Sequence, residues 1–177
     1  MTVRHRNDPP PRSAAGVGDF TDFYQAHFQR IAVQLYAYLG DHAEAQDLAQ
    51  EAFCRALERW SQVSTYDDPS AFVRRVAWNL ATSRLRRIGT ARRHVARQRA
   101  EHVPGPGPDR VALIRALATL PANQRRAIVL FHLAQLSSAE IAEQVGVAEG
   151  TVRSWLSRGR TALAGYFSET GSEAPRA

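Results

Sequence analysis

The sequence contains no lysine and only one cysteine, Cys54, among its 177 residues. A single cysteine excludes an internal disulfide framework and a metal site built from several thiolates. Because Cys54 lies in an apolar helical pattern, we expect it to be a small packed side chain. No apolar run approaches the roughly 18 residues that a membrane-spanning helix needs, and the basic N-terminus has no apolar stretch behind it. We therefore expect a cytoplasmic protein without a membrane partner.

The sequence also lacks an obvious catalytic or cofactor motif. None of its six histidines has the His-x-x-x-His spacing of a metal site, and no nucleophile motif is present. We therefore expect neither enzymatic activity nor a bound cofactor or metal. A small hydrolase or metalloenzyme is the alternative, and a metal assay combined with substitution of His27 and His132 would test it.

Acidic residues are missing from two stretches that are rich in arginine. Residues 69–99 contain nine arginines and residues 150–167 contain three, while the whole chain has a net charge of +6. Residues 41–60 instead contain five acidic residues against Arg55 and Arg59. Two basic surfaces and one acidic surface are typical of a protein that binds a polyanion and a separate protein partner. The alternative is that these charges only solvate helices, although nine uncompensated positive charges repel one another.

Apolar residues recur at helical spacing over residues 20–38, 41–60 and 69–88, which predicts three helices. Asp41 is expected to cap the second helix, with Glu44 three residues later completing a capping box. Strand-like alternation is absent from the sequence. The expected fold class is therefore all-α.

A segment of alternating proline and glycine, "HVPGPGPD", divides the chain, because it cannot sustain a helix or a strand interior. We expect two small helical domains joined by a flexible linker. The predicted divisions are a disordered tail over 1–18, the first domain over 19–93, the linker over 94–110, the second domain over 111–168 and a tail over 169–177.

The segment "SSAEIAEQVGVAEGTVRSWLSRGRTAL" has the pattern of two helices that cross steeply over a short turn. Ser137 and Glu140 have capping-box spacing. Ala142 is small where the two backbones approach, and Gly146 can take the left-handed conformation that redirects the chain. Val152 is apolar where the second helix returns to the first. These features together predict a helix-turn-helix.

The second helix of this unit points polar and basic residues outward. Arginine can bind guanine with two hydrogen bonds in the major groove, serine can bond to several base edges, and a good contact contributes about 1–3 kcal/mol of discrimination. The helix N-terminus also suits a phosphate. The alternative is a helical hairpin that only packs. The residues expected to contact DNA are Arg153, Ser154, Ser157, Arg158 and Arg160.

Three segments, in this order, resemble bacterial sigma factors of the extracytoplasmic-function group. "AEAQDLAQEAFCRALERW" is similar to the part of region 2 that binds the polymerase clamp, and "AFVRRVAWNLATSRLRR" is similar to the helix that meets the minus-ten promoter element. "LPANQRRAIVLFHLAQLSSAEIAEQVGVAEGTVRSWLSRGRTAL" resembles region 4, which binds the minus-thirty-five element. The resemblance covers roughly residues 20–167. It implies a region 2 helical bundle followed by a region 4 helix-turn-helix.

The resemblance implies a polymerase-binding surface on the helix over 41–60. Asp47, Gln50 and Glu51 lie on one stripe at helical spacing, and the expected partner is the clamp of the largest subunit of core RNA polymerase. Region 4 is expected to meet the flap of the second-largest subunit. The alternative for the stripe is an ordinary solvated face.

The resemblance also implies a minus-ten interface. Asn79 matches the asparagine near an unstacked base, whose edge an amide can read with donors and acceptors, and the loop with Ser64 and Tyr66 is expected to receive that base. Extruding a base costs a few kcal/mol. Trp78 either stacks on a base or packs beside Trp60 in the core. The other residues expected here are Arg74, Arg75, Ser83, Arg86 and Arg87, with Arg84 as a further phosphate contact.

The sequence departs from the family pattern at several of these positions. The family usually has a basic residue where Trp78 stands and commonly one where Trp155 stands. Phe131 occupies a position where a DNA-contacting arginine can occur, and Gln135 replaces a common glycine. The promoter preference of relatives therefore does not transfer to this chain.

The resulting prediction is a promoter-specificity subunit that binds core RNA polymerase, recognises both promoter elements and helps to melt the DNA. An inhibitory anti-sigma factor is a possible further partner. We expect weak DNA binding by the isolated chain, because its two basic surfaces are tethered without a set orientation. The rival is a stand-alone regulator, which would form a homodimer on a palindromic site.

Overall fold

Helices are the only regular elements in the described part of the chain, which is residues 17–91 and 108–172 of a computed structural model. The all-α prediction is confirmed. Within that part, no helix combines the length and the apolar character that crossing a membrane requires. In chain order the helices are α1 (Val17–Leu39), α2 (His42–Leu57), α3 (Trp60–Val63), α4 (Pro69–Ala91), α5 (Pro108–Thr119), α6 (Ala122–His132), α7 (Ser138–Val145) and α8 (Glu149–Ser172).

The predicted linker over 94–110 and the predicted tails over 1–18 and 169–177 lie largely outside the described residues. The two helices that border these segments in the second half are longer than predicted. α5 begins at Pro108, ahead of residue 111, and α8 continues to Ser172. A start at Pro108 is favourable because proline fits the first turn of a helix, where its missing N–H has no intrahelical partner to lose.

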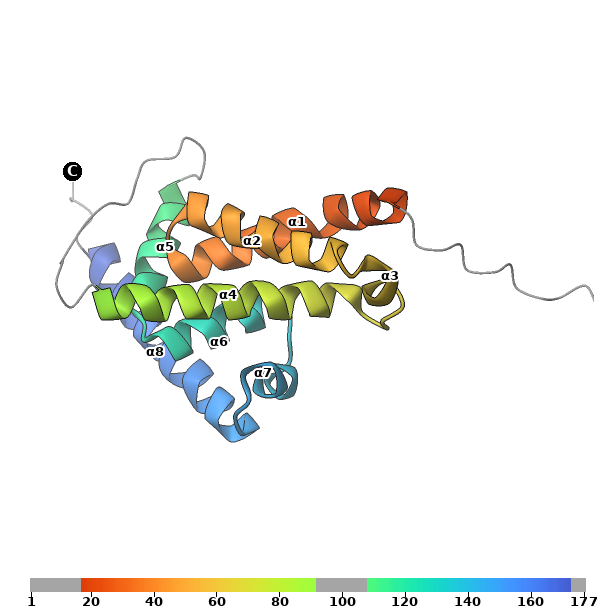
Figure 1. Ribbon diagram of the computed structural model, residues 1–177. Helices are drawn as coiled ribbons and strands as arrows, with labels where there is room; N and C mark the ends of the chain where they lie inside the picture. Colours follow the sequence, from red (N-terminus) through yellow and green to blue (C-terminus); the bar gives the residue numbers. More distant parts are fainter. Residues whose placement is uncertain (1–16, 92–107, 173–177) are drawn as a thin grey trace, which may run out of the picture.

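The first half of the molecule is a bundle of α1, α2 and α4, which lie side by side (Figure 1). The face that α2 turns to its neighbours is built from small residues, and Ala45, Ala49 and Ala52 are all completely buried. Small side chains let helix backbones approach closely, so α1 and α4 both pack against α2. Leu35 and Val73, which are also fully buried, contribute larger side chains to this core from α1 and α4.

Two tryptophans occupy different levels of this bundle. Trp60 closes one end, with its ring centroid 5.1 Å from that of Phe20 and 4.9 Å from that of Phe23. Trp78 is fully buried in the middle of α4, where its ring lies 4.9 Å from Tyr38 and its Nε1 donates to Gln34 at 3.4 Å. The prediction that Trp78 packs in the core is therefore right, but the position beside Trp60 is wrong. Trp60 meets the N-terminal part of α1, whereas Trp78 meets its C-terminal part.

The start of α2 has only half of the predicted capping box. The Asp41 carboxylate accepts a hydrogen bond from the backbone N–H of Glu44 at 2.9 Å, as expected of an N-cap. The Glu44 carboxylate forms an ion pair with Arg84 of α4 instead of returning to the cap. The ion pair with Arg84 on the neighbouring helix replaces the local contact. Arg84 was expected to bind a phosphate, and its guanidinium binds Glu44 instead.

The second half contains the predicted helix-turn-helix, formed by α7 and α8. The capping box of Ser137 and Glu140 is complete, with both reciprocal hydrogen bonds present. Gly146 has φ 77° and ψ 41°, the left-handed conformation that ends α7. Val152 at the start of α8 is fully buried. Farther along α8, Gly159 lets the helix pass over α6, because an added Cβ would lie 3.0 Å from Cγ1 of Ile128.

The turn before α7 contains an exception to ordinary backbone geometry. Gln135 has φ 60°, and it is the one residue other than glycine with a positive φ in the described part of the chain. Its side-chain amide donates to the backbone carbonyl of His132 at 2.7 Å, which holds the turn. A glycine would adopt this conformation without strain, because it has no Cβ.

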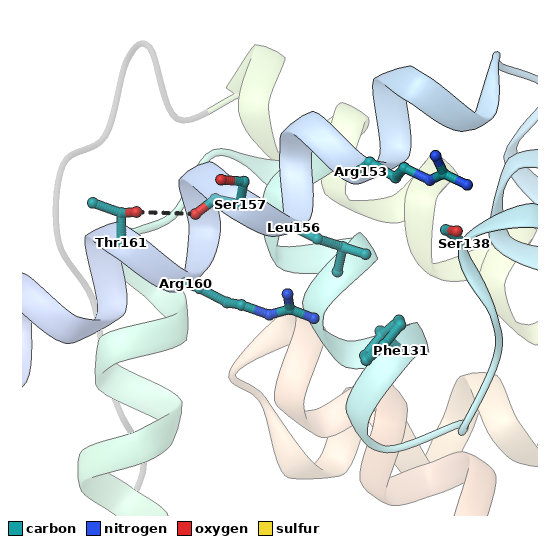
Figure 2. Close-up of a pocket in the computed structure, with 7 residues that line it drawn as sticks. All are labelled: Phe131, Ser138, Arg153, Leu156, Ser157, Arg160 and Thr161. Carbon is teal, nitrogen blue, oxygen red and sulfur yellow. Dashed lines mark hydrogen bonds between the residues drawn. The ribbon is translucent and has the colours of Figure 1, made fainter.

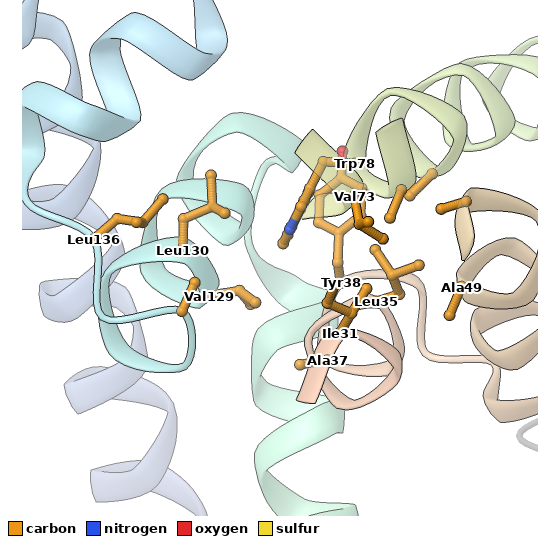
Figure 3. Close-up of a cluster of buried hydrophobic side chains, with 14 of the residues drawn as sticks. Ile31, Leu35, Ala37, Tyr38, Ala49, Val73, Trp78, Val129, Leu130 and Leu136 are labelled. Carbon is orange, nitrogen blue, oxygen red and sulfur yellow. The ribbon is translucent and has the colours of Figure 1, made fainter. Parts of the chain in front are cut away.

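The two halves pack against each other, which the sequence did not indicate. Figure 3 shows apolar side chains of the α6 side, including Val129 and Leu130, facing a cluster that contains Tyr38 and Trp78. Arg125 of α6 donates from Nη1 to the backbone carbonyl of Tyr38 at 2.9 Å. The buried core is therefore continuous from one half to the other.

Candidate functional site

Helix α8, the second helix of the helix-turn-helix, turns one face inward and another to solvent. Val152 and Leu156 are buried against the rest of the second half. The residues predicted to contact DNA lie on the remaining faces, and the Arg153 side chain is 70% exposed. Of that set, Ser154 is half-buried, and the exposed members are Arg153, Ser157, Arg158 and Arg160.

Glu149 joins the N-terminal turns of α7 and α8. Its Oε1 accepts hydrogen bonds from the Ser138 hydroxyl at 2.6 Å and from Nη2 of Arg153 at 2.7 Å. These two hydrogen bonds, that of Ser138 first, hold the pKa of Glu149 below its usual value. Glu149 therefore orients Arg153 at the end of the helix. Glu149 was not among the residues predicted from the sequence, although its i, i+4 spacing to Arg153 is a signal for such a pair.

A hollow of about 380 Å³ lies beside α8, between that helix, the end of α6 and the start of α7 (Figure 2). Arg153 and Arg160 line it from α8, and the Ser138 and Ser157 hydroxyls add polar groups. The guanidinium of Arg160 lies 5.0 Å from the ring centroid of Phe131, a cation–π contact. Phe131 thus holds an arginine of α8 close to the end of α6. The Ser138 hydroxyl already donates to Glu149, so an anion such as a backbone phosphate would meet the Arg160 guanidinium, the remaining N–H groups of Arg153 and the Ser157 hydroxyl.

The predicted minus-ten residues of α4 separate into an exposed stripe and a pair that faces the rest of the molecule. Arg74 is half-buried and Trp78 is fully buried. These two residues are four positions apart, so they lie on the same face of α4 as the core residue Ala77. The exposed stripe consists of Arg75, Asn79, Ser83, Arg86 and Arg87, which recur at helical spacing.

The loop before α4 lies at the start of that helix. Ser64 is half-buried, whereas Tyr66 is 39% exposed and its ring is edge-on to Phe72, with centroids 5.9 Å apart. Asp68 caps α4 by accepting from the backbone N–H of Ala71 at 3.0 Å. An exposed aromatic ring next to the capped start of a basic helix is chemically suited to an unstacked base.

The acidic stripe of α2 is exposed on the opposite side of that helix from its alanine face. Asp47, Gln50 and Glu51 all reach solvent. The side-chain oxygen of Gln50 accepts from the Tyr24 hydroxyl at 2.8 Å, and Glu51 pairs with Arg55. These contacts orient the amide and one carboxylate without covering them.

Cys54 and Leu57 continue the same face of α2, and sequence reasoning placed neither of them there. Leu57 is 45% exposed. Cys54 is also exposed, so the prediction of a packed cysteine is wrong. The buried face of α2 runs through Ala49, Phe53 and Ala56, and Cys54 falls outside it. The stripe is therefore an acidic surface with an apolar end.

Comparisons with known proteins agree with this arrangement. Residues 23–99 match the family model of sigma-70 region 2, and residues 110–163 match that of sigma-70 region 4. The ECF RNA polymerase sigma factor SigE of Mycolicibacterium smegmatis is 31% identical over 90% of this chain, which spans 65% of that relative's length. The RNA polymerase sigma-E factor of Streptomyces coelicolor is 32% identical, over 79% of this chain and 81% of the relative.

A solved structure shares the fold as well. The sigma factor RpoE of Bartonella quintana, in complex with the anti-sigma factor NepR, superposes with a TM-score of 0.72 at 24% identity. The match covers 86% of this chain and 98% of that one. Two matched regions in the family's order, together with relatives that cover most of the chain, show that this protein belongs to the sigma-70 family as an extracytoplasmic-function RNA polymerase sigma factor.

Proposed function

We propose that this cytoplasmic sigma factor divides promoter recognition between its two basic helices while α2 binds polymerase. The observation that carries the proposal is the separation of charge in the fold. Exposed arginines lie along α4 and α8, whereas the exposed carboxylates Asp47 and Glu51 lie on α2. Polyanionic DNA and a protein partner can therefore bind to different surfaces of one molecule.

We assign the minus-thirty-five element to α8. Its first turn would enter the major groove with Arg153 and Ser154, while the hollow beside Arg160 would take a phosphate of the DNA backbone. Base contacts supply specificity and phosphate contacts supply position. Glu149 contributes by restricting the orientations that Arg153 can adopt.

We assign the minus-ten element to the exposed stripe of α4. Asn79 would read an extruded base, with Ser64 and Tyr66 beside the start of the helix receiving it. Arg75, Arg86 and Arg87 would bind phosphates, the last two near the C-terminal half of the helix. Holding an extruded base in this way offsets part of the cost of unstacking it and would assist melting.

We assign core polymerase binding to the acidic stripe of α2, with the clamp of the largest subunit as its partner and the flap of the second-largest subunit as the partner of region 4. Solved structures of similar fold include the sigma factor RpoE in complex with the anti-sigma factor NepR, and CnrH in complex with the cytosolic domain of CnrY. An anti-sigma factor is therefore a further proposed partner. The chain itself is proposed to have no catalytic activity and no cofactor, because polymerase performs the chemistry.

Run-off transcription with core polymerase on genomic fragments tests the function as a whole. Specific start sites are expected only when the sigma factor is present. A stand-alone regulator would instead form a homodimer on a palindromic site and would give no start sites with core polymerase, which would contradict the proposal.

Matched substitutions test the assigned surfaces. Arg153→Ala should lower initiation most at promoters with an intact minus-thirty-five element, while Arg110→Ala, at an exposed position on α5, should have little effect. Asn79→Ala should lower open-complex formation while leaving polymerase binding intact. Asp47→Arg should weaken comigration with core polymerase, with Asp22→Arg on α1 as its control. Equal effects of a variant and its control would remove that assignment.

A further inference from the structure

Two arginines of α8 line the same hollow, but different kinds of side chain hold them. Arg153 donates to the Glu149 carboxylate at 2.7 Å, so its positive charge is offset by a negative one. The guanidinium carbon of Arg160 instead lies 5.0 Å from the centroid of the Phe131 ring (Figure 2). In the part of the chain that the structure describes, no carboxylate forms an ion pair with Arg160. The uncompensated positive charge of the hollow therefore comes from Arg160.

The packing of α6 on α8 places the Phe131 ring beside this arginine. Gly159 lies against Ile128, where an added Cβ would be 3.0 Å from Cγ1 of the isoleucine, so the two helices approach closely at this level. Phe131 is three positions after Ile128 and therefore lies on the same face of α6. Arg160 follows Gly159 directly, and because a helical side chain leans toward the N-terminus of its helix, the guanidinium extends along α8 into the hollow. The contact thus follows from the close crossing of two helices.

An aromatic ring holds a cation in a different way from a carboxylate. The negative face of the ring attracts the guanidinium through its quadrupole. The ring has no net charge, so it restricts the position of the guanidinium without neutralising it. The Arg160 side chain remains exposed, and a guanidinium can donate up to five hydrogen bonds to an anion. The contact with Phe131 therefore leaves Arg160 both ordered and fully charged.

The histidine at the end of α6 lies close enough to be affected by this charge. The His132 ring is edge-on to Phe131, with centroids 5.0 Å apart. Burial lowers the pKa of His132, and the positive charge of Arg160 lowers it further. A lowered pKa favours the neutral imidazole. The charge presented to an anion at this place therefore comes from Arg160 rather than from His132.

We propose that Phe131 is a positioning residue for DNA binding: its ring holds Arg160 at the wall of the hollow, where the guanidinium meets a phosphate of the DNA backbone. This inference rests on the proposed function, since it concerns the phosphate assigned to the same hollow. Arg153, whose charge Glu149 offsets, is suited to a base edge, whereas the uncompensated Arg160 is suited to a phosphate. Ordering Arg160 before DNA arrives lowers the side-chain entropy that is lost on binding.

Substitutions of Phe131 separate the aromatic face from the bulk of the side chain. Phe131→Tyr keeps the face, and the hollow beside it has room for the hydroxyl. Phe131→Leu and Phe131→Met keep an apolar side chain without that face. The full-length free chain with either change should bind random duplex at low salt about two- to fivefold less tightly, the range of an exposed cation–π contact, while Phe131→Tyr should bind almost as the unchanged chain does. Phe167→Leu removes an exposed ring of α8 that does not line the hollow, and it should leave the affinity unchanged.

A double-mutant cycle identifies the partner of the ring. Arg160→Ala should reduce the magnitude of the log–log salt slope by about 0.9, because one phosphate contact is lost. Phe131→Leu should have no further effect on affinity in the Arg160→Ala background. It should keep its full effect in the Arg158→Ala background, since Arg158 is exposed on α8 but does not line the hollow. An unchanged affinity in Phe131→Leu, an equal loss in Phe131→Tyr, or a loss that persists without Arg160 would overturn the inference.

Two further readouts distinguish positioning from damage to the fold. In the free chain, the ring current of Phe131 should shift the side-chain proton resonances of Arg160, which Arg160→Ala identifies by their loss. The shift should persist in Phe131→Tyr and disappear in Phe131→Leu. In the holoenzyme, Phe131→Leu should weaken binding to promoter and to random duplex by the same factor, because a phosphate contact carries no sequence information. A changed ratio of the two affinities would indicate a displaced α8 and would overturn the inference.

Run-off transcription by the unchanged chain separates this inference from the proposed function. Absence of specific start sites, with the coupling of Phe131 to Arg160 intact on random duplex, refutes the proposed function alone. Specific start sites without that coupling refute the positioning role of Phe131 alone.

Discussion

The turn of the helix-turn-helix gives a prediction that can be worked out from backbone geometry alone. Gly146 has φ 77°, and a Cβ added there would meet no atom within 4 Å. Gly146→Ala therefore creates no clash, and its cost is the conformational penalty of a left-handed residue with a Cβ, about 1–2 kcal/mol. For a chain of this size, each kcal/mol lowers Tm by about 2–4 °C.

A second glycine provides a control of opposite sign. Gly165 lies within α8 in ordinary helical geometry, and an added Cβ there also meets nothing within 4 Å. Gly165→Ala should stabilise the protein by about 0.5–1 kcal/mol, because alanine restricts the unfolded chain and favours the helix. The same methyl group in two open positions should thus have opposite effects on stability.

Urea unfolding followed by far-UV circular dichroism measures both variants, and Gly146→Asn completes the series. Asparagine tolerates the left-handed conformation better than alanine, so this variant should recover part of the lost stability. In the holoenzyme, Gly146→Ala should also weaken minus-thirty-five binding, because the turn sets the angle between α7 and α8. If Gly146→Ala were as stable as the unchanged protein, or if Gly165→Ala were equally destabilising, the argument from φ would be refuted.

Three further outcomes are expected. Hydrogen bonds from the Ser137 side chain and backbone lower the pKa of Glu140. The stability that they contribute is therefore present above the usual glutamate pKa and is lost as the pH falls through the pKa of the folded state. Urea midpoints measured across an acid series should show that loss, and Glu140→Gln should make the midpoint less dependent on pH. Glu149→Gln removes a negative charge beside DNA and loosens Arg153. It should therefore raise the affinity for random duplex and lower the ratio of promoter affinity to random-duplex affinity. An unchanged ratio of the two affinities in competition assays would contradict this. Holoenzyme binding should weaken with salt, and about six phosphate contacts correspond to a log–log slope near −5, whereas a slope near zero would exclude a phosphate-dominated interface.

Local signals in the sequence were sufficient for most of the secondary structure and for the helix-turn-helix. Ser137, Glu140 and Gly146 each act within one turn of the chain, so their spacing predicts the caps and the bend that the structure contains. The exposed stripe of α2 and the outward residues of α8 follow from helical periodicity in the same way. Family resemblance then added the functional meaning of these surfaces, which periodicity does not contain.

Contacts between distant segments account for what sequence reasoning missed. Glu44 has the spacing of a capping box, yet it pairs with Arg84, which is forty residues away along the chain. Cys54 has an apolar pattern around it but falls beside the buried face of α2. The periodicity of a helix gives the relative directions of its side chains, but it does not say which neighbouring element each direction meets.

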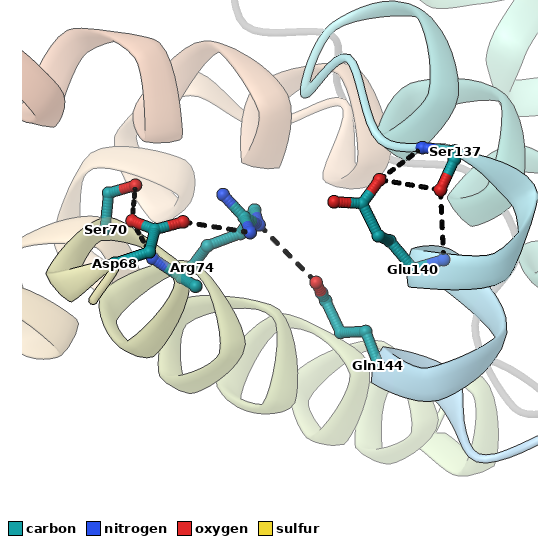
Figure 4. A network of polar contacts seen from close by, with 7 residues as sticks. Asp68, Ser70, Arg74, Ser137, Glu140 and Gln144 are labelled. Carbon is teal, nitrogen blue, oxygen red and sulfur yellow. Dashed lines mark hydrogen bonds and ion pairs between the residues drawn. The ribbon is translucent and has the colours of Figure 1, made fainter. Parts of the chain in front are cut away.

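The sequence alone determined that this chain has two helical regions with basic helices and an acidic stripe, because those properties depend on residues within a few turns of one another. Only the tertiary structure decided that Arg74 and Trp78 face the other half of the molecule rather than solvent. Arg74 contacts Gln144 (Figure 4) and Trp78 contacts Arg126, and both partners lie far along the chain and on different helices. Such pairings arise from how whole helices pack, and the spacing of residues within one helix does not predict them.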